Sequence, residues 1–214
     1  PMGNMTGDAW SWAAVIASAL PICGYELHLW RAARRNPAAT ARSAHRLLRG
    51  EWVQALAKHP GSELLAVQAL RNSLMSATIN ASTAALALMG SISLMAAKAS
   101  VGALRLSPYL ALQLALVLTL FAAYVCSAFA MRYYHHAGFA MSLPVGSPAR
   151  EARTQLAASY VQSAGILYSW SLRCFLFVAP IVGGLLHPWL SPPVSLALLL
   201  VLALFDRPPS SSAA

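Results

Sequence analysis

The sequence predicts an all-α fold, a polytopic membrane helix bundle, and three observations carry that prediction. Hydrophobic residues make up 58% of the 214 residues and charged residues only 10%, and the mean hydropathy is +0.57. The apolar residues gather into long stretches, four of which have the roughly 20 residues that a helix needs to cross about 30 Å of hydrocarbon. Since lipid offers no partner to backbone N–H and C=O groups, such stretches form helices.

Five apolar stretches follow one another, over residues 9–30, 72–97, 109–131, 165–186 and 192–205. The first lacks the basic start and cleavage site of a signal peptide, so we expect it to remain as a helix. The first four predict transmembrane helices. The fifth is shorter and follows the proline-rich run HPWLSPP, which predicts a short span or a re-entrant segment. We expect one integral membrane domain over residues 1–207 and a disordered Ser/Pro/Ala tail over 208–214.

Basic residues orient the predicted bundle. The first loop carries seven of them: Arg31, Arg34, Arg35, Arg42, Arg46, Arg49 and Lys58. Loops rich in lysine and arginine stay in the cytoplasm, so this loop is predicted to be cytoplasmic, with the N-terminus outside and the C-terminus inside. The predicted location is the bacterial inner membrane. Membrane topology also accounts for the net charge of +9, so no nucleic-acid partner is expected.

The first loop itself predicts an amphipathic helix on the cytoplasmic face. Leu47, Leu48, Trp52 and Leu56 recur at helical spacing, and Pro60-Gly61 ends the run. Such a helix serves as a gate or anionic-lipid sensor, or as an interfacial anchor with Trp52 at headgroup depth. We favour the anchor.

Charged residues inside the apolar stretches indicate a site. Arg71 and Arg173 lie within predicted spans, and Glu26 is the only carboxylate that the pattern embeds with them. A charge at mid-membrane is costly, so these side chains should face protein or water. Glu26 is expected to pair with Arg71 or with Arg173. The alternatives are a structural ion pair, which we favour, and an anion or proton site.

The second stretch carries a polar face. A rotation of 100° per residue brings together Asn72, Ser76, Asn80, Thr83, Ala87 and Gly90. Such a stripe allows helices to pack closely or lines a wet pathway, and packing is the commoner explanation. Asn80, near mid-membrane, requires a specific partner. The proposed intramembrane polar or ion site therefore comprises Glu26, Arg71, Asn72, Asn80 and Arg173.

Histidines end two of the predicted helices. His28 follows Glu26, and His135 and His136 lie in RYYHHAGF. Adjacent histidines point about 100° apart on a helix, so an interfacial role is favoured over a metal site. The usual hydrolase, nucleotide and metalloprotease motifs do not occur, and we expect no catalytic residues, no metal and no cofactor, hence no enzyme.

Several of these residues also carry a family resemblance. The runs YELHLWRAARRNP and GEWVQALAKHPGSELLAVQALRNSLMSATINASTAALALMG, with the later SLRCFLFVAP, resemble the membrane family of plants and bacteria catalogued as domain of unknown function 599. The resemblance covers nearly the whole chain. It implies a compact multi-pass membrane protein, and it implies no activity.

Two functions follow as hypotheses. The first is a small homo-oligomeric channel or transporter that passes an anion or a proton at the arginine site. The second is a non-catalytic accessory or assembly subunit that docks in a larger membrane complex through its small-residue stripe. Both need the lipid bilayer as surroundings and other protein chains as partners.

Overall fold

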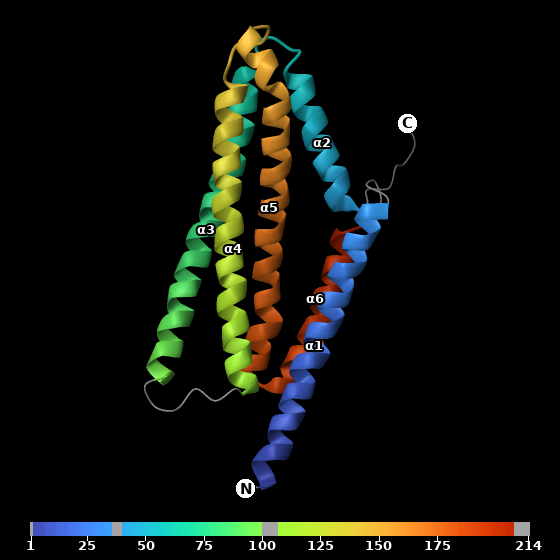
Figure 1. Ribbon diagram of the computed structural model, residues 1–214, viewed down its shortest axis with the longest axis vertical. Coiled ribbons are helices and arrows are strands. Elements are labelled where there is room, and N and C mark those ends of the chain that lie inside the picture. Colours follow the sequence, from blue (N-terminus) through green and yellow to red (C-terminus); the bar gives the residue numbers. More distant parts are fainter. Residues whose placement is uncertain (1, 36–39, 100–106, 208–214) are drawn as a thin grey trace. The chain divides into compact units, whose positions relative to one another are not determined.

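The protein is described by a computed structural model, which defines residues 2–35, 40–99 and 107–207. The described residues are almost all helical (Figure 1). The helices are α1 (Met2–Arg35), α2 (Ala41–Leu56), α3 (Glu63–Ala99), α4 (Pro108–Met141), α5 (Pro148–Leu186), the 3-10 turn η1 (Pro188–Leu190) and α6 (Ser191–Phe205). No strand occurs within those ranges, so the prediction of an all-α protein is confirmed. The predicted tail, residues 208–214, lies outside them.

Within the described ranges, five helices are long and apolar enough to cross a membrane. They span Asp8–Arg35, Glu63–Ala97, Pro108–Met141, Pro148–Leu186 and Pro188–Phe205. Their positions agree with the five apolar stretches of the sequence. The predicted bounds were too short for α3, α4 and α5, because each helix continues into a less apolar segment. At 34 to 39 residues, these helices are roughly 50 to 60 Å long, well beyond the hydrocarbon thickness.

The chain divides into two compact units. The first comprises Pro1–Ala41, Ala85–Ala122 and Arg173–Ala214, and the second comprises Arg42–Ala84 and Ala123–Leu172. The first unit therefore holds α1, α6 and one end each of α3, α4 and α5, whereas the second holds α2 and the other ends of those three helices.

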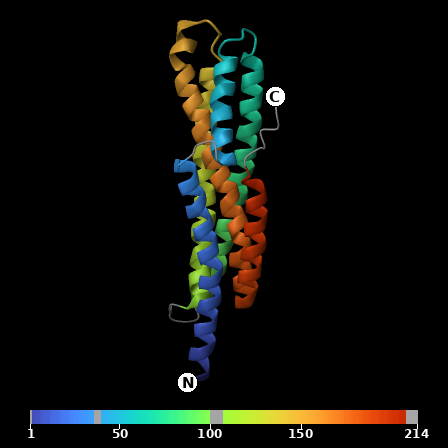
Figure 2. The same cartoon turned by 90° about the vertical axis from the view of Figure 1, so that its right-hand side faces the viewer.

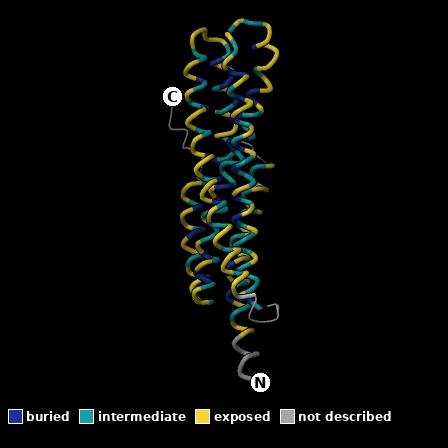
Figure 3. The backbone as a smooth tube through the Cα atoms, turned by 90° about the vertical axis from the view of Figure 1, so that its left-hand side faces the viewer, coloured by how far each residue is buried: buried dark blue, intermediate teal, exposed yellow. Residues whose placement is uncertain are grey.

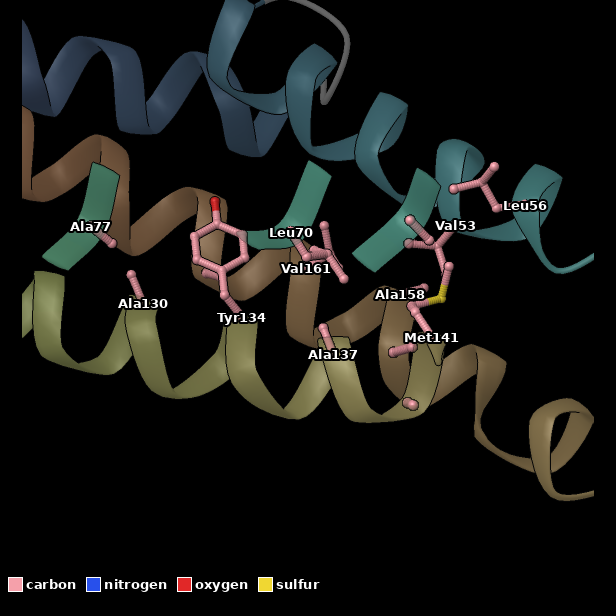
Figure 4. Packing of buried hydrophobic residues seen from close by; sticks show 14 residues of the cluster. Val53, Leu56, Leu70, Ala77, Ala130, Tyr134, Ala137, Met141, Ala158 and Val161 are labelled. Atoms are coloured by element: carbon pink, nitrogen blue, oxygen red, sulfur yellow. The ribbon is translucent and has the colours of Figure 1, made fainter. Parts of the chain in front are cut away.

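The second unit has an apolar core of small side chains. Val53 and Leu56 of α2 pack with Leu70 of α3, Tyr134 and Met141 of α4, and alanines from α3, α4 and α5 (Figure 4). Alanine at these positions lets the helices approach closely. A helix thus occupies the first loop as predicted. It buries Val53 and Leu56, whereas Leu47 and Leu48 stay 49% and 60% exposed, and its position on a membrane surface remains a prediction.

In the first unit, α1 and α6 lie side by side (Figures 1 and 2). One face of α6 is buried, and it presents Ser191, Ser195, Leu198 and Leu202 at helical spacing. The turn from α5 into α6 is tight because Gly184 has no side chain: an added Cβ would lie 3.0 Å from Leu112 and 3.2 Å from Cβ of Ser191. The Ser191 hydroxyl also donates to the Pro180 carbonyl oxygen at 2.9 Å.

Exposed residues run along all the helices (Figure 3). Many large apolar side chains are among them, including Leu86 at 71% and Leu196 at 62%. In water such surfaces would be unfavourable, but in a bilayer they contact acyl chains. This pattern agrees with the membrane class that the composition predicted.

Candidate functional site

The candidate site surrounds the buried guanidinium of Arg173, in the first unit. Arg173 lies on α5, and its side chain is 7% exposed. Its Nη1 donates to Oε1 of Glu26 on α1, and its Nη2 donates to Oδ1 of Asp206 at the end of α6. The two carboxylates are 16% and 12% exposed. One guanidinium thus binds two carboxylates and joins three helices.

Tyr25 extends the network on the side of Asp206. Its hydroxyl donates to Oδ2 of Asp206 at 2.9 Å, so both carboxylate oxygens of that residue are engaged. Asp206 caps the C-terminus of α6, and its backbone N–H donates to the Leu202 carbonyl oxygen at 2.9 Å. We refer to Tyr25, Glu26, Arg173 and Asp206 as the Arg173 cluster.

The helix ends explain why these side chains meet. Glu26 and Tyr25 are adjacent on α1, which packs along α6. The chain turns back at η1, so the antiparallel α6 returns along the last part of α5 and ends beside Arg173. Asp206 is the first residue after the helix, where it follows the apolar run that ends at Phe205.

The charges of the Arg173 cluster decide what it can bind. A single guanidinium holds two carboxylates, so the positive charge of Arg173 is already matched by acidic groups. An anion entering here would meet two negative side chains. A proton would meet two carboxylates that share one cation. The C-terminal end of the α6 dipole also opposes the charge of Asp206.

The predicted site residues are distributed over both units. Glu26 was expected to pair with Arg71 or with Arg173, and it forms an ion pair with Arg173. Arg71 and Asn72 are exposed on α3 in the second unit. Asn80 is partly buried there, and its Nδ2 atom is buried without a hydrogen-bond partner among the described residues. Most of the polar stripe on α3 is exposed, and Thr83 satisfies its hydroxyl by donating to the Ile79 carbonyl oxygen.

The predicted interfacial residues do not belong to the Arg173 cluster. His28, His135 and His136 are exposed. The ring of His136 lies 5.7 Å from that of Tyr160, and Trp52 packs partly buried against the core of the second unit. Among the described residues, no group of three or more His, Cys, Asp or Glu side chains is arranged to hold a metal ion.

Sequence reasoning missed two charged residues. Asp206 was left out because it follows the last apolar stretch, and the expectation that Glu26 is the only embedded carboxylate is wrong. The sequence feature that could have identified Asp206 is its position directly after an apolar helix. Arg150, in the first turn of α5, is the second, and it is only 1% exposed. Its Nη1 donates to the Ala140 carbonyl oxygen at 2.9 Å, and its Nε and Nη2 are buried without a partner in the described ranges.

Comparison with known proteins supplies a family and no activity. No curated protein and no solved structure matches the chain. One family model matches residues 13–211, which include the whole Arg173 cluster, and its description is "Protein of unknown function, DUF599". The match covers nearly the whole chain and confirms the resemblance seen in the sequence. The chain therefore belongs to the family of proteins of unknown function 599.

Proposed function

We propose that this protein is a small membrane channel or transporter in which the Arg173 cluster binds and releases protons. The observation that supports this proposal is the pairing of Arg173 with two carboxylates from two helices, Glu26 and Asp206. Of the two ligands considered from the sequence, the anion is disfavoured because Arg173 already binds acidic groups. The proton is favoured because carboxylates are its natural acceptors.

The proposed step is the protonation of Asp206. A proton on this carboxylate removes its negative charge and weakens its ion pair with Arg173, while Glu26 keeps the guanidinium paired. The C-terminal end of α6 is then held less tightly to α5. Release of the proton restores the ion pair, so proton binding is linked to the position of α6.

Proton flux in proteoliposomes tests the proposal. The purified full-length chain is reconstituted with a pH-sensitive dye inside the vesicles, and a potassium diffusion potential drives protons inward. Wild-type protein should acidify the lumen faster than protein-free vesicles do. Asp206→Asn should lower that rate because the amide cannot exchange a proton, and Arg71→Gln, an exposed arginine on α3, serves as the control for loss of charge.

Two results contradict the proposal. Wild-type flux equal to that of protein-free vesicles would refute proton transport, and equal flux through wild type and Asp206→Asn would remove the Arg173 cluster from the pathway. A chloride or nitrate flux that depends on Arg173 would favour an anion instead.

The second candidate, an accessory or assembly subunit, draws on the surface of α3. Residues 85–97 of this helix include no buried residue, and they carry Gly90 and several serines and alanines. Small residues of this kind allow close contact with another helix in lipid. The particle mass in native lipid discs distinguishes the candidates: multiples of this chain alone favour the channel, and a co-purified second chain favours the subunit.

A further inference from the structure

In the second unit, α2 and α5 pack through a reciprocal pair of glycines. The guanidinium of Arg49 on α2 covers Gly165 of α5, where an added Cβ would lie 2.3 Å from its Cζ. The side-chain amide of Gln162 on α5 covers Gly50 of α2, where an added Cβ would lie 2.3 Å from its Nε2. Because each glycine lacks a side chain, a polar side chain of the other helix packs directly against its backbone.

Arg49 is partly buried, and within the described ranges it forms no ion pair with an acidic side chain. One hydroxyl group, that of Tyr134, interacts with it electrostatically. Tyr134, 7% exposed, lies within electrostatic range of Arg49 and shares a hydrogen bond with the side chain of Ser73 (Figure 4 shows Tyr134 reaching from α4 into the core). A partly buried guanidinium that forms no ion pair with an acidic side chain of the described residues suits an oxyanion.

The exposed side of α2 beside Arg49 combines a cation with apolar groups. Arg46 is exposed, and Leu47 and Leu48 are 49% and 60% exposed. This combination of basic and apolar side chains is typical of a helix surface that contacts anionic lipid. Acyl chains would lie against the two leucines, and the phosphate would face the arginines.

We propose that Arg49, held against Gly165, binds the phosphate group of an anionic lipid headgroup at the α2–α5 contact. The guanidinium supplies paired N–H donors to the phosphate oxygens, and its fixed position on the α5 backbone makes it the specific contact. Arg46, which is exposed, attracts the same phosphate at longer range and without a fixed geometry. The chemistry recognised is the phosphate oxyanion, so inorganic phosphate is the alternative source.

The test measures ligand affinity from the thermal unfolding midpoint of the full chain in neutral detergent. The probes are short-chain phosphatidylglycerol, short-chain phosphatidylcholine and inorganic phosphate. Phosphatidylglycerol should raise the midpoint of the wild type more than phosphatidylcholine does. Arg49→Gln should weaken its affinity about tenfold or more, as expected for the loss of a charge-assisted hydrogen bond. Arg46→Gln, the matched control on the same helix, should weaken it about twofold or less.

Gly165→Ala keeps every charge and moves only the guanidinium, because the new Cβ takes its place. This variant should lose affinity for phosphatidylglycerol as Arg49→Gln does, and without ligand it should unfold at the wild-type midpoint. If Arg49→Gln fails to fold, Gly165→Ala therefore still tests the proposal. Equal losses in Arg49→Gln and Arg46→Gln, or no effect of phosphatidylglycerol or phosphate on the wild type, would overturn the proposal. Inorganic phosphate that binds as tightly as the lipid, with the same dependence on Arg49, supports the site and identifies free phosphate as its ligand.

Discussion

Removing Arg173 should cost the protein far more than removing either of its carboxylate partners. Arg173→Met leaves Glu26 and Asp206 close together, each less than a fifth exposed, with their shared cation gone. Loss of one partner from a buried ion pair costs about 3 to 5 kcal/mol in unfolding free energy. Glu26→Gln or Asp206→Asn leaves the guanidinium paired with the other carboxylate, so each should cost only about 1 to 2 kcal/mol.

The triple variant provides the decisive comparison. Once Arg173→Met, Glu26→Gln and Asp206→Asn are combined, no charge is left unpaired, so stability should return to within about 2 kcal/mol of the wild type. The assay is unfolding in mixed detergent micelles, followed by helical circular dichroism, with the exposed Arg153 changed to Met as control. If the three losses simply add, the charges do not interact and the reasoning is refuted.

Three further predictions follow from the fold. An impermeant thiol reagent applied from outside should label a cysteine at Gly7 and spare one at Ser43, and the opposite result would invert the topology. Gly184→Leu should cost about 1 to 3 kcal/mol because its neighbours lie within 3.2 Å of an added Cβ, whereas Gly90→Leu, with open space, should leave the unfolding free energy of the chain unchanged. Arg150→Met should keep the thermal midpoint within a few degrees of wild type, because methionine fills the volume without the two unpaired donors, and a collapse of stability would show that the charge is required.

The helices were predictable because the bilayer imposes a strong rule on composition. Residues that cross hydrocarbon must be apolar for about 20 positions, and that rule located the first four stretches. The rule on apolar length could not give the helix ends. Helix α5 begins at Pro148, and its first half contains polar residues such as Gln155 and Gln162, which a search for apolar stretches leaves out. Helix propensity and packing in the second unit extend these helices.

The site was half predictable. Glu26 and Arg173 stood out because charges are rare in apolar helices. Asp206 did not, because its burial depends on α6 returning antiparallel to the end of α5, a tertiary fact absent from the local pattern. Arg71 was grouped with Arg173 because both lie within apolar-rich helices; the structure places Arg71 near the start of α3, on an exposed face. Sequence spacing gives the face of a helix, and only packing decides whether that face is covered.

Proton binding at the Arg173 cluster is tested most directly by measuring the protonation of Asp206 itself. Infrared difference spectra of the protein in lipid bilayers, recorded between neutral and acidic pH, report carboxylates that become carboxylic acids. We expect a carbonyl stretching band for a buried carboxylic acid in the wild type that disappears in Asp206→Asn and persists when the exposed Glu151 is changed to Gln. Identical spectra for wild type and Asp206→Asn, over the pH range in which protons cross the membrane, would contradict proton binding at the Arg173 cluster.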